Sequence, residues 1–142
     1  MLNDNLEIYL LLLLLLFVLY LGWKLRKIYK NIIFFLNKRR GKKAEKKAIK
    51  LLKKNGYKIQ NYQPIAKGHV LQDNEKIHFD IRADLIVSKD KKLYIAEVKT
   101  GASASIKEIN TRRQLLEYSK VFENNNLILI DTEKNKIKKI EF

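Results

Sequence analysis

The sequence predicts an α/β domain with a central mixed sheet flanked by helices, preceded by one N-terminal transmembrane helix. Three observations support this fold class. Residues 8–23, "IYLLLLLLLFVLYLGW", are uncharged and almost wholly apolar. After residue 41, helical patterns and short runs of β-branched and aromatic residues alternate. Two of those runs are apolar on both faces, as in a sheet covered on each side by helices. A chain of 142 residues provides one ordinary domain plus an appendage.

Composition narrows the class of protein and of partner. The chain has no cysteine, which excludes disulfides and thiolate metal sites. Its formal net charge is +15, and all 30 lysines and arginines lie at or after Lys24. A surface of this kind favours polyanions, either nucleic acid or an anionic membrane face.

The apolar run predicts a membrane anchor within residues 1–23. As a helix, residues 8–23 would be about 24 Å long. The hydrocarbon core of a bilayer is about 30 Å thick, and the helix can span it if Leu6 is included and the Lys24 side chain extends outward to the headgroups. Aromatic residues stand near its ends, as interfacial aromatics do. A signal peptide would carry positive charge before the run and small residues after it, and neither is present. The alternative, a buried core helix, would need more surrounding chain than this sequence has.

A basic segment, "KLRKIYKNIIFFLNKRR" at residues 24–40, follows the anchor. Its apolar residues recur at helical spacing against a basic face, which predicts a helix that continues from the span or lies on the lipid surface. We therefore expect contact with membrane lipid through residues 6–23 and 24–40, although this segment could also touch nucleic acid. Acids precede the span and cations follow it, so the positive-inside rule predicts an N-terminus outside and a cytoplasmic domain.

The predicted domain covers residues 41–142. A helix begins near Gly41 and stops at Asn55-Gly56, and Glu45 is its only acid, equally consistent with a surface ion pair and with a site role. A strand run follows to Ile65, and then a loop of uncertain course through Gly68 to Asn74. Strands at 76–87 and 92–100 are joined by the turn 88–91. A helix at 105–121 and a strand with a hairpin partner at 126–142 complete the order.

The hairpin register places charged residues together. If the turn centres on Asp90 and Lys91, Asp84 stands directly opposite Glu97, with Cβ atoms about 5 Å apart. Alternation adds Lys99 to the same face. Two adjacent carboxylates repel each other unless a cation intervenes.

This set of side chains suits a hard divalent ion. Mg²⁺ or Mn²⁺ is usually held by one or two carboxylates plus waters and substrate phosphate. A nearby lysine can hold a water molecule or offset charge that develops on phosphorus. The trio therefore predicts metal-dependent hydrolysis of a phosphodiester.

These residues resemble the PD-(D/E)XK nuclease superfamily. Asp84 is followed by Glu97-Val98-Lys99 on the next strand, and Glu45 matches a helix acid that many members carry. Gln114 and Tyr118 have the Q-x-x-x-Y spacing of RecB-like and Cas4-like exonucleases, and the order of elements resembles Holliday-junction-resolvase-like members. The resemblance covers residues 41–131. It departs from the pattern before Asp84, where alanine replaces proline.

The resemblance implies a restriction-endonuclease-like core and specific roles. The metal ligands would be Asp84, Glu97 and the carbonyl of Val98, and Glu45 would act directly or through water. Lys99 would assist the attacking water, while Gln114 and Tyr118 would position substrate.

Other residues are assigned from their neighbourhood alone. Arg112, Arg113 and Lys107 lie near the Q-x-x-x-Y residues and are candidates for backbone phosphate contacts. His69 and His78 have no partner at metal-ligand spacing, so we expect them to be incidental.

Two functions follow as expectations. The first is a membrane-anchored, Mg²⁺- or Mn²⁺-dependent nuclease, an endonuclease or exonuclease that acts on DNA from the cytoplasmic side. The second is a catalytically silent module that tethers nucleic acid to the membrane. Both predict salt-sensitive binding, and only the first predicts cleavage that depends on a divalent ion.

Overall fold

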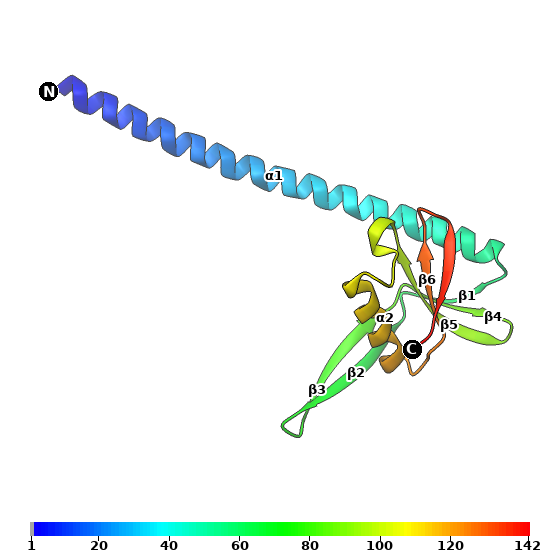
Figure 1. Ribbon diagram of the computed structural model, residues 1–142. Coiled ribbons are helices and arrows are strands. Elements are labelled where there is room, and N and C mark those ends of the chain that lie inside the picture. The colour runs from blue at the N-terminus through cyan, green and yellow to red at the C-terminus, as the bar shows by residue number, and fades with distance from the viewer. Residues whose placement is uncertain (1) are drawn as a thin grey trace. The chain divides into compact units, whose positions relative to one another are not determined.

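The computed structural model describes residues 2–142, with side-chain exposure from residue 6 onward. The chain divides into two compact units, 1–41 and 42–142. The first unit is helical and belongs to α1, which runs from Leu2 to Lys54 (Figure 1). Its apolar part reaches a mean hydropathy of 2.3 and is fully exposed, so by length and composition it could cross a membrane or be a signal sequence. Asp4, one of the acids behind the predicted orientation, lies outside the residues whose side chains are described.

The second unit begins with the last turns of α1, and the end of this helix is well defined. The helix passes through Gly41, where we expected it to begin, and ends at Lys54. The Asn55 side-chain amide donates to the carbonyl of Leu51, at 2.8 Å. Gly56 has φ +80°, a left-handed conformation that glycine adopts without a steric penalty. The predicted stop is therefore confirmed.

A five-stranded mixed sheet forms the centre of this unit. The strands are β1 (Lys58–Tyr62), β4 (Leu85–Lys89), β5 (Lys92–Lys99), β6 (Leu127–Asp131) and β7 (Lys136–Ile140), in the order β1-β4-β5-β6-β7. Only the β5–β6 pair is parallel. A parallel pair requires a crossover connection, which here contains α2 (Ile109–Val121). The predicted mixed α/β class and the C-terminal hairpin are confirmed.

Helices cover both faces of this sheet. On one face, Ala48 and Leu52 of α1 pack into a buried cluster with Val87, Ala96 and other strand residues. On the other face, Leu115 and Tyr118 of α2 pack with strand residues that include Ile95, Leu127 and Leu129. Strand β6 is buried along its whole length. Because both faces are covered, a polar side chain at this level of the sheet has little access to water.

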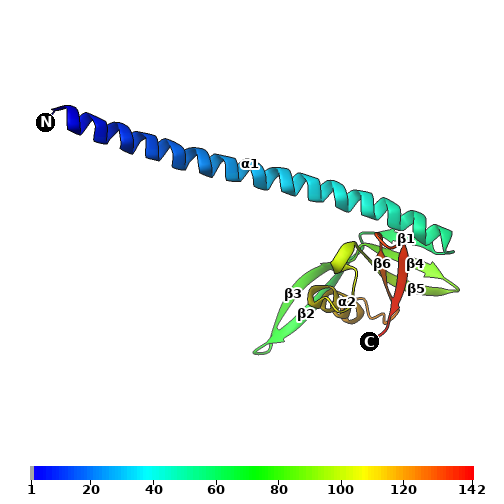
Figure 2. The same cartoon turned by 45° about the horizontal axis from the view of Figure 1, so that its top comes forward.

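The segment that we expected to be a loop is a strand. β2 (Ile65–Gln72) pairs with β3 (Glu75–Arg82) as a separate antiparallel hairpin, which extends alongside α2 in Figures 1 and 2. Its turn is Asp73-Asn74, with φ of 50° and 70°, the conformation of a two-residue hairpin turn. Gly68 leaves room for the ring of Phe79, which would lie 2.6 Å from an added Cβ atom.

The strand predicted at 76–87 is two strands, β3 and β4. The break falls at Ala83-Asp84, where the chain leaves the hairpin and enters the central sheet. Two backbone hydrogen bonds fix this crossing: Ala83 N–H donates to the carbonyl of Pro64, and Gln63 N–H donates to that of Asp84. Asp84 is thereby held immediately before β4 instead of within a strand.

The predicted helix at 105–121 begins four residues later than expected, at Ile109. Before it, a short 3₁₀ turn, η1, covers Gly101–Ser103. The Thr111 hydroxyl donates to the carbonyl of Ser103, at 2.8 Å, and Lys107 N–H donates to the Ser105 hydroxyl, at 3.2 Å. These local bonds give residues 103–108 an alternative to the helix, and α2 starts only after them.

Candidate functional site

The site is built at the far end of the β4–β5 hairpin. The predicted register is confirmed, since Lys89 pairs with Lys92 and Leu85 pairs with Ala96. The next position on β4 would hold Asp84, which has left the ladder. Its carboxylate Oδ2 instead accepts a hydrogen bond from Val98 N–H, at 2.8 Å. The Asp84 side chain is thus fixed against the backbone that carries Glu97 and Lys99.

Glu97 is a buried carboxylate with a partner on each oxygen. Its side chain is only 3% exposed. The Lys99 amine lies 2.8 Å from Oε1, and the Tyr118 hydroxyl lies 2.8 Å from Oε2. One partner comes from the same strand and the other from α2, so the carboxylate is held between a cation and a neutral donor.

Tyr118 links Glu97 to the surface of α2. The residue is 1% exposed, and its hydroxyl accepts a hydrogen bond from the Gln114 amide, at 2.7 Å. The single hydroxyl proton is shared between Glu97 and the carbonyl of Arg82, at 2.9 Å. Burial, and next the negative charge of Glu97, raise the pKa of Tyr118. The hydroxyl therefore remains protonated and acts as a donor toward Glu97.

Both acids of the site resist ionisation. Burial is the main cause that raises the pKa of Glu97, and the charge of Asp84 adds to it. Burial also raises the pKa of Asp84, against the opposing effects of Val98 N–H and of the Lys99 and Arg82 charges. An ionised pair here is costly without additional positive charge, because each acid is desolvated and each disfavours the other.

The structure brings most of the predicted site residues together. Direct contacts link Asp84 to Val98, Glu97 to Lys99 and Tyr118, and Tyr118 to Gln114.

Glu45 is not brought into this group. It is half-buried one turn before Ala48, which packs on the sheet face opposite to that of Tyr118. Among residues 6–142 it makes no hydrogen bond or ion pair with the other predicted ligands, and no group of three His, Asp or Glu side chains has metal-ligand geometry. Its role stays a prediction.

The predicted phosphate-binding residues lie just before α2 and near its start. Lys107, Arg112 and Arg113 are all exposed. Arg112 also donates to the carbonyl of Ile106, at 3.3 Å, which holds its guanidinium near the start of α2. Their contact with nucleic acid stays a prediction.

The two histidines are neighbours, which sequence reasoning missed. His69 and His78 stand directly opposite each other on β2 and β3, with ring centroids 6.0 Å apart. Treating residues 68–74 as a loop hid this pairing. The Asp73-Asn74 dipeptide was the available indication, because these residues tolerate the positive φ of a tight hairpin turn.

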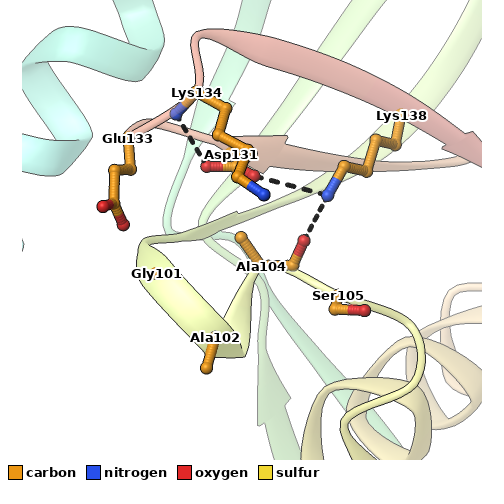
Figure 3. Close-up of a pocket in the computed structure, with 8 residues that line it drawn as sticks. All are labelled: Gly101, Ala102, Ala104, Ser105, Asp131, Glu133, Lys134 and Lys138. Atoms are coloured by element: carbon orange, nitrogen blue, oxygen red, sulfur yellow. Dashed lines mark hydrogen bonds and ion pairs between the residues drawn. The ribbon is translucent and has the colours of Figure 1, made fainter.

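A second polar cluster lies at the carboxyl ends of β5 and β6. Asp131 is the register partner of Lys99 and lines a pocket of about 370 Å³. Figure 3 shows its carboxylate between the backbone of Lys134 and the amine of Lys138, which also donates to the carbonyl of Ala104. Burial acts to raise the pKa of Asp131, but these donors outweigh it and lower that pKa. This carboxylate therefore stabilises the turn between β6 and β7.

Comparisons with known proteins show the fold alone. No protein-family model matches the chain, and no curated protein matches it. A solved structure, that of SSO0001, is similar with a TM-score of 0.54 at 21% sequence identity. The match covers 71% of this chain and 49% of SSO0001, so the chain matches about half of that protein's length. The likeness supports a mixed α/β domain with a sheet flanked by helices.

Proposed function

We propose that residues 42–142 form a divalent-metal-dependent nuclease with a restriction-endonuclease-like core. One observation carries the proposal: Glu97 is held almost completely buried between Lys99 and Tyr118, with Asp84 fixed beside it. Burying two neighbouring carboxylates costs free energy unless each is paired or bound to metal. An acid pair with an adjacent lysine matches the chemistry of phosphodiester hydrolysis better than it matches a structural ion pair, which needs only one acid.

The residues present fit Mg²⁺ or Mn²⁺. Asp84 and Glu97 offer hard oxygen ligands, and Val98, whose carbonyl is the third predicted ligand, directly follows Glu97 in the sequence. Mg²⁺ commonly uses only one or two carboxylates and fills its remaining positions with water and phosphate oxygens. When bound, such an ion polarises a phosphoryl oxygen and lowers the pKa of its water. A third carboxylate is not required, so the position of Glu45 does not count against the site.

Lys99 has two positions to occupy in this proposal. Its amine neutralises Glu97 at 2.8 Å and its side chain remains 27% exposed, so it can turn toward solvent. An ion on Glu97 would replace the positive charge that Lys99 provides. The released amine could then hold the attacking water or offset charge on the phosphoryl group.

Gln114 and Tyr118 act in this proposal on Glu97. Tyr118 is buried, so its hydroxyl reaches the carboxylate and not an incoming substrate. The chain of hydrogen bonds from Gln114 through Tyr118 to Glu97 fixes the orientation of one ligand oxygen. Such outer partners orient metal ligands and contribute to metal affinity.

The remainder of the proposal concerns place and substrate. The apolar part of α1, residues 6–23, is a transmembrane anchor, and the cations after it place the domain on the cytoplasmic side. The net charge of +15 favours a polyanion, and DNA is the expected substrate.

The test uses purified full-length protein in detergent with labelled single-stranded, duplex and branched DNA and with RNA. We expect cleavage with Mg²⁺ or Mn²⁺, none with EDTA, and none from Glu97→Gln under any condition. Cleavage that persists in EDTA would reject the metal-dependent mechanism.

A second candidate, the silent nucleic-acid tether, is favoured by one specific observation. Lys99 and Tyr118 already satisfy both oxygens of Glu97, so the cluster is complete without an ion. The tether predicts salt-sensitive DNA binding with no cleavage of any substrate and no effect of divalent ions.

A further inference from the structure

We propose that the part of α1 following the apolar run is a self-association surface, and that its occupant is a second copy of this chain. The surface is the heptad stripe, defined as Leu25, Ile28, Ile32 and Phe35. It goes beyond the proposed nuclease function and does not depend on it, although it uses the proposed membrane span.

The spacing of the stripe is that of a coiled coil. Leu25 and Ile32 are seven residues apart in the sequence, as are Ile28 and Phe35, so the four occupy the two apolar positions of successive heptads. Their exposed fractions are 57%, 48%, 53% and 59% in chain order. Tyr29 and Leu36 widen the apolar side. Large apolar side chains repeated along one face of a helix require a covering partner, unlike scattered exposed residues.

The charges of the same segment lie away from the stripe. Lys24, Arg26, Lys27, Lys30 and Lys38 all fall at other heptad positions, and no acid lies between residues 24 and 40. Arg26, Lys27 and Lys30 lie on the outer positions and remain in water or among headgroups when two stripes meet, whereas Lys24 and Lys38 flank the stripe. The repeat ends at Arg39, where the next apolar position carries a charge.

Lipid, which we expected from the sequence to contact residues 24–40, is a poor covering for this stripe. The helix is unbroken from Leu2 to Lys54, and residues 23–40 contain neither glycine nor proline, the usual causes of a sharp bend. From Lys24, Ile32 lies about 12 Å further along the axis and Phe35 about 16 Å. One headgroup layer is only about 5–8 Å thick. A straight helix whose first part spans the bilayer therefore carries these residues beyond the lipid.

A second copy matches the stripe, given the proposed membrane span. Two identical chains inserted by the same span have the same orientation and depth, so their stripes meet in parallel and in register. An apolar heptad repeat is complementary to itself. The association would also bring two copies of residues 42–142 to one membrane face.

The chain has no cysteine, so single cysteines report on the contact directly. Ile28→Cys and Ile32→Cys are made in the full-length protein, with Lys27→Cys and Lys30→Cys as controls one or two residues away on the other side of the helix. Membranes that contain each variant are oxidised, and disulfide-linked dimer is measured. We expect a disulfide-linked dimer from the two stripe variants and no dimer from the two controls, because a disulfide forms only between Cα atoms within about 7 Å of each other.

Two outcomes overturn the proposal. Equal cross-linking at all four positions would show random collision, and no cross-linking at Ile28→Cys and Ile32→Cys would show that copies do not meet there. Labelling with a membrane-impermeant maleimide then shows whether something else covers the stripe. If Ile32→Cys neither cross-links nor reacts with the maleimide, lipid or another protein covers the stripe. Extraction with carbonate on the same membranes shows independently whether the span itself has failed.

Discussion

Removing the Tyr118 hydroxyl tests whether the hydrogen-bond chain holds Glu97. Tyr118→Phe deletes a 2.8 Å bond to Oε2 of Glu97 and leaves the ring packing in place. A hydrogen bond to a charged group contributes about 1.5–3 kcal/mol, and a neutral one about 0.5–1.5 kcal/mol. Gln114 is half-buried, so water can replace its bond to the hydroxyl, and the carbonyl of Arg82 competes with Glu97 for the same hydroxyl proton. We therefore expect a loss of about 1.5–3 kcal/mol in the free energy of unfolding at a pH where Glu97 is ionised.

The loss should depend on pH in a definite direction. The Tyr118 hydrogen bond lowers the pKa of Glu97, against the larger effect of burial, so it stabilises the ionised carboxylate. In acid, where Glu97 is protonated, the deletion should cost only about 0.5–1.5 kcal/mol.

Urea unfolding of fragment 42–142, followed by near-ultraviolet circular dichroism, measures both values. Tyr94→Phe is the matched control, because Tyr94 is also buried and its hydroxyl makes no hydrogen bond within residues 6–142. Equal losses in the two variants, or a Tyr118→Phe loss that does not change with pH, would refute the proposed link to Glu97.

Three further results are expected. Burial raises the pKa of Asp84 and of Glu97 in the folded state. Their contribution to stability is therefore full at a pH below the pKa values of the unfolded chain, and it is lost as the pH rises through the pKa values of the folded state. In thermal melts without metal, Asp84→Asn or Glu97→Gln should reduce this loss of stability with rising pH. Each variant should also abolish the stabilisation by Mn²⁺ that we expect in the parent. Destabilised variants, together with a parent whose melting temperature does not respond to Mn²⁺, would indicate a structural salt bridge. Gly68→Ala should cost about 1–3 kcal/mol in urea unfolding, since its Cβ would meet the Phe79 ring at 2.6 Å, and an unchanged midpoint would contradict that packing. A reporter fused after Phe142 should be cytoplasmic and the chain should resist carbonate extraction; an external reporter or a soluble chain would reject the anchor.

The elements with a strong local pattern could be predicted from the sequence. Apolar residues on both faces, with a four-residue turn, were enough to predict the β4–β5 register and hence the neighbourhood of Asp84, Glu97 and Lys99. The end of α1 followed from the conformational freedom of Gly56.

The missed elements depend on contacts distant in sequence. Lys67, Gly68 and His69 interrupt the apolar pattern of β2, so this strand is recognisable only with its partner β3. The break at Ala83-Asp84 depends on backbone bonds to Gln63 and Pro64. Likewise, the Q-x-x-x-Y spacing predicted a shared helix face for Gln114 and Tyr118, but only the fold shows that this face points at Glu97.

The central claim is tested most directly by initial cleavage rates in Mn²⁺, with DNA binding measured on the same preparations. Asp84→Ala, Glu97→Ala and Lys99→Ala should each abolish cleavage and leave salt-dependent binding largely unchanged, because many other cations contact phosphate. Lys67→Ala and Asp80→Ala, a lysine and an aspartate directly opposite each other on the β2–β3 hairpin, are the controls and should retain cleavage. Full activity in a folded variant at Asp84, Glu97 or Lys99 would contradict the account.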